Sequence, residues 1–296
     1  MNLPVRHLIQ ASILAALVCV PPAFLTSCSS GGDGGTSDGG SGSSATVAST
    51  DNAGAAATDT TTSDAAAVTN VGGAVTATIK GSVVFKGVAT PRKKINMASN
   101  KDCVALHTGG VPLSERLVVG ENGAVANSFV WVSKGLENQT FPVPAEKVIF
   151  DQRGCKYTPH VFGVMAGQEI EVRNSDPTMH NVHIRPKRNR VVNRSQTKQG
   201  DVFIQKFRKS ETKPVRIKCD VHPWMTAYAG VLDHPYFAIS GDDGTFELPK
   251  IAPGTYTVSI WHESHEYGDL EATVTEQKVT IGDGETKELA PFEYSE

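Results

Sequence analysis

The 296-residue sequence predicts an all-β fold. Amphipathic helical periodicity is nearly absent, and short alternating or β-branched runs are separated by turn signals instead. The turns at 121–123, 242–244 and 253–254 each supply a residue that tolerates positive φ. After the N-terminal region described next, about 220 residues remain, which is enough for one large or two small β domains.

The N-terminus, residues 1–27, has the pattern of a bacterial lipoprotein signal peptide. Its apolar run, 8–20, is too short to span a bilayer as a mature helix. Leu25-Thr26-Ser27-Cys28 resembles a lipobox, in which the chain is cleaved before the cysteine and Cys28 is acylated. An ordinary signal peptide with a fortuitous cysteine is the alternative. We expect a lipid anchor in a membrane of the bacterial cell envelope, with the protein facing the periplasm or the cell exterior.

Residues 28–73 form the next compositional segment. They are rich in Gly, Ser, Thr, Ala and Asp and contain almost no large apolar residue. Such a segment cannot bury enough apolar surface to offset the entropy lost on ordering, so we expect a disordered tether.

The elements expected after the tether are all strands, bounded by the turn signals above. They are 76–86, 116–119, 128–133, 147–152, 168–174, 180–185, 202–207, 215–219, 228–232, 237–240, 245–248, 255–261, 271–281 and 287–290.

Cys219, His222 and Met225 place a thiolate, an imidazole and a thioether within seven residues. One more imidazole, from His180 upstream, completes the set of two His, one Cys and a weak axial Met that is typical of a blue-copper electron-transfer site. A single tight loop would fix three of these ligands relative to one another. This is the strongest functional signal in the sequence.

The motif Cys-x-x-His-Pro-x-Met at 219–225 resembles the ligand loop of amicyanin, a small plastocyanin-type cupredoxin. Residues 179–184 are similar to that family's Pro-His-Asn-Val-His-Phe, and 156–159 and 166–174 resemble its first strands. The resemblance covers 146–234 and implies a Greek-key sandwich that binds one type 1 copper ion. The ligands it implies are His180, Cys219, His222 and Met225.

Two histidines, His180 and His183, are candidates for the imidazole ligand that precedes Cys219 in the chain. Positions three apart point to opposite sides of a straight strand, so His180 and His183 cannot easily bind one metal. The resemblance favours His180, which leaves His183 as a half-buried or surface imidazole. It also implies that Asn181 lies behind the ligands and ties the two ligand loops together by hydrogen bonding.

The resemblance implies that the His222 edge lies at the surface within an apolar patch and that electrons pass through it. Trp224 either enlarges that patch or closes the end of the sandwich as a core residue. Asp220-Val221 replace a usual Thr-Pro pair. A carboxylate beside the thiolate could depress the reduction potential.

Residues 235–296 carry a second resemblance. The region contains Asp243-Gly244 with Phe246 and Leu248, followed by Pro253-Gly254-x-Tyr. These residues carry a resemblance to the carboxypeptidase regulatory-like (transthyretin-type) β-sandwich. Residues 74–145 form an N-terminal β segment, and its run 79–85 is a candidate for the opening strand of the same sandwich. Such modules usually have no chemistry of their own.

The five cysteines divide by context. Cys19 leaves with the signal peptide, Cys28 is lipidated and Cys219 binds the metal. Cys103 and Cys155 remain in an oxidising compartment, where disulfides persist, so we predict that they pair.

The other charged and histidine-rich motifs are less specific. A basic run at 185–198 is either a docking surface for an acidic redox partner or a solvated loop. Export and a net charge of −3 exclude a nucleic-acid partner. His160 is expected to be structural, and His262-Glu263-Ser264-His265 is one residue short of the His-Glu-x-x-His metalloprotease motif.

These observations predict a single-copper electron carrier that is not an enzyme and that meets a cytochrome or another copper protein. Multicopper oxidases need His-x-His pairs, which the sequence lacks, and a binuclear copper-A centre needs two thiolates in one loop. The alternative is an envelope copper-binding or structural lipoprotein in which the β-sandwich is the functional part.

Overall fold

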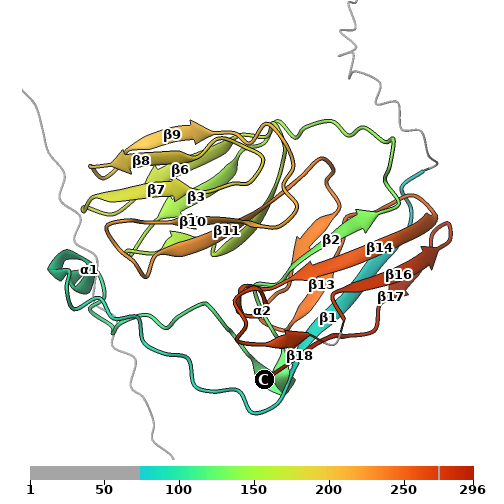
Figure 1. Ribbon diagram of the computed structural model, residues 1–296, viewed down its shortest axis with the longest axis horizontal. Coiled ribbons are helices and arrows are strands. Elements are labelled where there is room, and N and C mark those ends of the chain that lie inside the picture. The colour runs from blue at the N-terminus through green and yellow to red at the C-terminus, as the bar shows by residue number, and fades with distance from the viewer. Residues whose placement is uncertain (1–73, 273) are drawn as a thin grey trace, which may run out of the picture. The chain divides into compact units, whose positions relative to one another are not determined.

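The computed structural model describes residues 74–272 and 274–296, and the predicted all-β class is confirmed (Figure 1). The signal peptide, Cys28 and the expected tether lie outside the described residues. None of the helices in the described ranges is long and apolar enough to cross a membrane.

Two of the four sheets form what we term the central sandwich. Its strands are β3 (Val148–Gln152), β4 (Tyr157–Thr158), β5 (Val161–Met165), β6 (Ile170–Asn174), β7 (His180–Ile184), β8 (Val192–Gln196), β9 (Val202–Gln205), β10 (Val215–Lys218) and β11 (Thr226–Leu232). One sheet has the order β5-β11-β10-β7-β8 and the other β4-β3-β6-β9. Alternate residues of β6 are buried, as expected for a strand with one face on a core.

The other two sheets form the terminal sandwich. Its strands are β1 (Thr78–Lys86), β2 (Phe129–Lys134), β12 (Phe237–Ile239), β13 (Thr245–Glu247), β14 (Gly254–Trp261), β15 (Glu271–Ala272), β16 (Glu276–Ile281), β17 (Thr286–Glu288) and β18 (Phe292–Ser295). β1 pairs with β13, β17 and β18, while β2 lies between β12 and β14. Strands from before and after the central sandwich therefore share both sheets (Figure 1).

Three expectations about elements are wrong, and the strands β4, β5, β8 and β18 were not predicted. Residues 116–119 form no strand, because the apolar Leu117 and Val119 pack on the terminal core with only an isolated bridge from Val119 to Val125. The run 271–281 is divided into β15 and β16. Two short helices were not predicted: α1 (Lys101–Ala105) and α2 (Glu263–Glu266).

Two glycines allow the sandwiches to approach closely. A Cβ atom on Gly163 of β5 would lie 2.1 Å from the Phe237 ring, and one on Gly230 of β11 would lie 2.1 Å from the Phe129 ring. Phe129 belongs to a separate buried cluster with Val161, Tyr228, Leu232 and Trp261, drawn from both sandwiches. The two sandwiches can pack this closely because Gly163 and Gly230 have no side chain.

Gly230→Ala is expected to destabilise the fold, because the added methyl group would force the Phe129 ring out of its packed position. Overpacking of this kind typically costs about 1–3 kcal/mol. Denaturant unfolding would measure the loss. Gly109→Ala is the matched control, since its added Cβ meets nothing within 4 Å. Equal stability of the two variants would contradict the close packing.

Candidate metal centre

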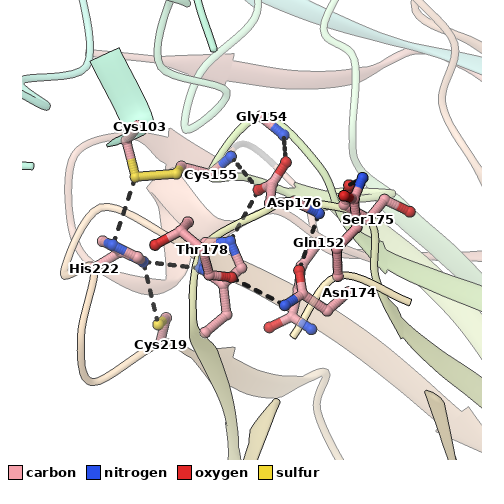
Figure 2. Close-up of polar contacts among 12 residues, drawn as sticks. Cys103, Gln152, Gly154, Cys155, Asn174, Ser175, Asp176, Thr178, Cys219 and His222 are labelled. Atoms are coloured by element: carbon pink, nitrogen blue, oxygen red, sulfur yellow. Dashed lines mark hydrogen bonds and ion pairs between the residues drawn. A yellow bond between two sulfur atoms is a disulfide. The ribbon is translucent and has the colours of Figure 1, made fainter. Parts of the chain in front are cut away.

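Three buried side chains converge at one end of the central sandwich (Figure 2). His180 begins β7, Cys219 follows the last residue of β10, and His222 lies in the loop between β10 and β11. One nitrogen from each histidine and the Cys219 sulfur all lie within 4.8 Å of one another. His180 Nδ1 is 2.9 Å from His222 Nδ1, which is 3.8 Å from Cys219 Sγ.

The loop that carries two of these groups is closed by its own backbone. Cys219 N–H donates to the Met225 carbonyl at 3.1 Å, and Met225 N–H donates to the His222 carbonyl at 2.9 Å. The Lys218–Thr226 pair of the flanking hairpin fixes the register. Met225 is buried and packs in the same core cluster as Cys219. The loop thus turns Met225 back toward the end of the sandwich where Cys219 lies.

Asp176 orients His180. The histidine donates from Nε2 to Asp176 Oδ2 at 2.9 Å, and the same carboxylate accepts from the backbone N–H groups of Gly154 and Cys155 at 2.6 and 2.7 Å (Figure 2). A proton held on Nε2 leaves Nδ1 with its lone pair toward the other two groups. Asp176 was not predicted from the sequence, although a carboxylate four residues before the candidate ligand His180 was a usable signal.

The Asp176–His180 pair stabilises the charged form of each partner. Burial by itself raises the pKa of Asp176, but the hydrogen bonds from His180, Cys155 and Gly154 outweigh it and the net pKa is lowered. Burial likewise lowers the pKa of His180, and the bonds to Asp176 and Cys219 more than offset it, so the net pKa is raised.

Asn181 joins the two segments that carry the ligands. Its Oδ1 accepts from the Asp220 backbone N–H at 2.7 Å and from the Cys219 thiol at 3.3 Å. The Asp220 carboxylate is occupied elsewhere: Lys218 approaches it at 2.7 Å and His183 at 2.9 Å. Hydrogen bonds from the Lys218 and His183 side chains hold the pKa of Asp220 well below its usual range. His183 is therefore engaged with Asp220 and does not reach the three converging groups.

The Cys219 thiol has an acidic pKa. Burial by itself raises it, but hydrogen bonds from the His180 and His222 side chains and the backbone at Asn181 outweigh that effect and lower the pKa to about 6. The thiolate is the form that binds metals, so the site favours metal binding at neutral pH.

A depressed pKa predicts how the metal-free protein responds to pH. The native state stabilises the thiolate, so this contribution is complete above the ordinary thiol pKa of 9.0 and is lost as the pH falls through about 6. We expect thiolate ultraviolet absorbance to appear around pH 6, and the unfolding free energy to rise between pH 6 and 9. The Cys219→Ser variant, titrated in parallel, should show neither change. Absorbance that appears only near pH 9 would rule out the acidic thiol.

The expectation that the His222 edge lies at the surface is wrong. The residue is 1% exposed, because the segment 96–107 lies over it. Asn100 Nδ2 is 2.8 Å from His222 Nε2. Cys103 Sγ is 3.5 Å from the same nitrogen (Figure 2). We call residues 96–107 the covering segment. Its short helix α1 is capped by the Asn100 side chain, which accepts from Cys103 N–H.

A disulfide fixes the covering segment to the central sandwich. Cys103 and Cys155, which the cysteine count predicts to pair, are joined with a Cα–Cα distance of 5.6 Å. His107 Nε2 adds a hydrogen bond of 2.8 Å to the Gly154 carbonyl. The cover is therefore held at several points along its length.

Trp224 combines features of both alternatives considered for it. Its ring lies 5.2 Å from that of His222, and its Nε1 donates to the Cys155 carbonyl at 3.0 Å. It is half-buried and lines a cleft of about 410 Å³. Trp224 is thus the aromatic residue beside His222 that retains some exposure.

The other histidines take up structural roles. His160 is 3.1 Å from the Thr226 carbonyl and 2.6 Å from a Glu263 carboxylate oxygen. The His262 side chain accepts from Ser264 N–H and caps α2, and His265 is 3.0 Å from the Leu270 carbonyl. In the described ranges, none of the candidate metal-holding groups contains these three residues.

Comparisons with known proteins return cupredoxins, with low overall similarity. Amicyanin from Paracoccus versutus is 20% identical, with 34% of this chain and 96% of amicyanin covered and a TM-score of 0.26. A purple cupredoxin from Nitrosopumilus maritimus is 19% identical over 28% of this chain and 98% of that protein, with a TM-score of 0.24.

A copper-containing nitrite reductase from Thermus scotoductus is 17% identical over 35% of this chain, with a TM-score of 0.28. The chain spans about a quarter of that enzyme's length, since 25% of it is covered. No family model matches the chain, and neither does any curated protein.

Proposed function

We propose that the protein is a one-electron carrier in which His180, Cys219, His222 and Met225 would hold a single type 1 copper ion. The observation that carries this proposal is the convergence of two imidazole nitrogens and one acidic thiol within 4.8 Å in a buried position. A soft thiolate and two imidazoles form the donor set that suits copper in a trigonal site.

The residues around the three groups support rigid binding. Asp176 fixes the tautomer and orientation of His180, and Asn181 holds Cys219 and the start of its loop. The covering segment excludes water from the His222 ring. When bound, copper would accept and return one electron. Ligands already held by hydrogen bonds have little to rearrange in such a step, and small reorganisation favours fast exchange.

The test of this proposal is spectroscopic. After Cu(II) loading, the full chain is expected to show an intense visible band from the thiolate and narrow copper hyperfine splitting by EPR. A colourless protein, or an ordinary tetragonal Cu(II) signal, would mean that Cys219 does not bind the ion as proposed.

Asp176→Asn is expected to weaken copper binding by roughly 10- to 100-fold, the usual cost of losing a residue that orients a metal-binding histidine. The amide keeps the shape of the carboxylate but loses the charge that holds the proton on His180 Nε2. Competition with a Cu(II) chelator measures the affinity. Asp151→Asn is the matched control, because its carboxylate is bonded to Ser175 and not to a ligand. Equal copper affinities of the wild type and Asp176→Asn would show that Asp176 does not support metal binding.

One observation favours the alternative of a copper-binding protein without rapid electron exchange. His222 is closed to solvent, and a ligand edge that partners cannot reach slows transfer. Stopped-flow reduction of the copper-loaded protein separates the two functions. A carrier is reduced and reoxidised quickly and reversibly, whereas a storage or structural site need not be.

For the setting of this function we propose the bacterial cell envelope, with a lipid on Cys28 as the anchor and a cytochrome or another copper protein as the redox partner. The support is the sequence pattern of residues 1–27 and the disulfide, which persists in oxidising compartments. Radiolabelled fatty acid incorporated by the wild type but not by Cys28→Ser would establish the anchor.

A further inference from the structure

We propose a second binding site, separate from the metal centre: a basic cleft between the edges of the central sandwich that takes an extended acidic segment of a partner protein. The cleft has a volume of about 620 Å³ and is lined by β8, β9 and the loops that follow β7 and β9. Six of its lining residues are cations: Arg188, Arg190, Arg194, Lys206, Arg208 and Lys209.

The positive charge of the cleft is not neutralised from within. None of the described residues that line it is Asp or Glu. Lys206 pairs with Glu169 at 3.0 Å, while the other five cations form no salt bridge with the described carboxylates. Arg194 instead lies 4.5 Å from the centroid of the Phe203 ring. This concentration of charge lies in a protein whose net charge is −3, so it is a local feature of this cleft.

The fold holds the two cationic loops together. Glu211 is buried and accepts from the backbone N–H groups of Lys187 and Arg188 at 3.0 and 2.8 Å. Asn189 donates to Glu211 at 2.8 Å and accepts from the backbone N–H groups of Arg208 and Lys209 at 2.7 and 3.1 Å. The cations of the two loops repel one another, so the loops would separate if nothing held them. Glu211 and Asn189 hold them side by side, which indicates a preformed anion site and not a solvated loop.

The shape of the cleft indicates an extended chain. Among the described strands, β8 pairs only with β7 and β9 only with β6, so both present an unpaired edge to the cleft. Val191, which is exposed, and Val192 line the cleft and offer apolar contacts. A free anion would not use such contacts, and a flat membrane surface does not enter a concave site. An arginine guanidinium group can bind a carboxylate through two parallel hydrogen bonds. The arginines of the cleft therefore suit the carboxylates of an acidic peptide.

The site is distinct from the metal centre. In the β7–β8 ladder His180 is opposite Gln196, whereas Ile184, from which the basic loop departs, is opposite Val192. The loop thus starts about 13 Å along the strand from His180, at about 3.3 Å per residue. None of the four candidate metal ligands lines the cleft. The site therefore recruits a partner without contacting the proposed copper.

Fluorescence anisotropy on the metal-free full chain tests the site, with a labelled oligoglutamate peptide as the probe. We expect binding that weakens as salt is added, and no binding of oligolysine. Arg190→Glu with Arg208→Glu should weaken binding by roughly tenfold or more. Lys250→Glu with Lys278→Glu is the matched control: it makes the same charge change at exposed lysines outside the cleft and should leave binding unchanged.

Glu211→Ala separates a built site from general attraction. It makes the protein more positive, so non-specific attraction predicts tighter binding, whereas loss of the support beneath the loops predicts weaker binding. Three results would overturn the proposal: equal losses in the two charge-reversal variants, tighter binding by Glu211→Ala, or co-sedimentation with anionic phosphatidylglycerol vesicles in place of peptide binding. Because no copper is present, the result is independent of the proposed electron transfer.

Discussion

Cys219→Ser is expected to abolish the intense visible band of the copper-loaded protein while the fold is retained. The band requires a thiolate bonded to copper, and Cys219 is the free cysteine in the described part of the chain. A serine hydroxyl is only slightly smaller than the thiol and can also donate to Asn181 Oδ1, so the fold should be retained. Loss of the band is therefore expected to be complete, not partial.

Absorption and EPR spectra of the wild type and the variant, loaded identically, check this expectation. Circular dichroism shows whether the variant is folded. Ser259→Ala, a buried hydroxyl in the terminal sandwich, is a suitable control and should leave the band unchanged. An unchanged spectrum in Cys219→Ser would count decisively against the proposed centre.

Removal of the disulfide is expected to destabilise the protein and to open the metal centre at the same time. In the chain-entropy model, a bond between cysteines 52 residues apart stabilises the fold by about 4 kcal/mol. The bond also fixes the covering segment over His222, so Cys103→Ser with Cys155→Ser should leave that segment free to move away from the ring.

Two measurements separate these effects. Denaturant unfolding gives the loss of stability, and the alkylation rate of Cys219 in the metal-free protein gives the opening of the site. Lys101→Ala is the control, because this exposed residue lies in the covering segment without bonding to His222. If Cys219 reacted at the same slow rate without the disulfide, the covering segment would not be what closes the site.

Local sequence was sufficient for the central part of the candidate site. Cys219, His222 and Met225 lie in one loop, so their spacing alone limits how far apart they can be. His180 was predicted because residues 179–184 resemble the corresponding segment of the amicyanin family, and Asn181 because it is the adjacent residue. Most of the strands were predictable because a half-buried strand alternates apolar and polar residues over a few positions. The strands β4, β5, β8 and β18 were not predicted.

Residues distant in the chain could not be found in this way. Asn100 contacts His222 across 122 residues, and the Cys103 sulfur across 119. No local pattern marks the segment 96–107 as a cover, because its one helix is short and its contacts with His222 join residues far apart in the chain. The sequence analysis therefore expected an exposed His222, which the tertiary structure contradicts.

The basic run is a second case of the same limit. Its charge was visible in the sequence, but a solvated loop and a docking site have the same composition. The distinction lies in Glu211 and Asn189, which bind backbone groups from two loops that are adjacent only in the folded chain.

The sequence by itself determined the all-β class and indicated the group of candidate ligands, since alternation along a strand and spacing within a loop are local properties of the chain. Only the tertiary structure decided that His222 is covered, that the basic loops form a cleft, and that strands from both ends of the chain share their sheets. The physical reason is that these features depend on contacts between distant segments, which form only when burial and hydrogen bonding outweigh the entropy of closing long loops.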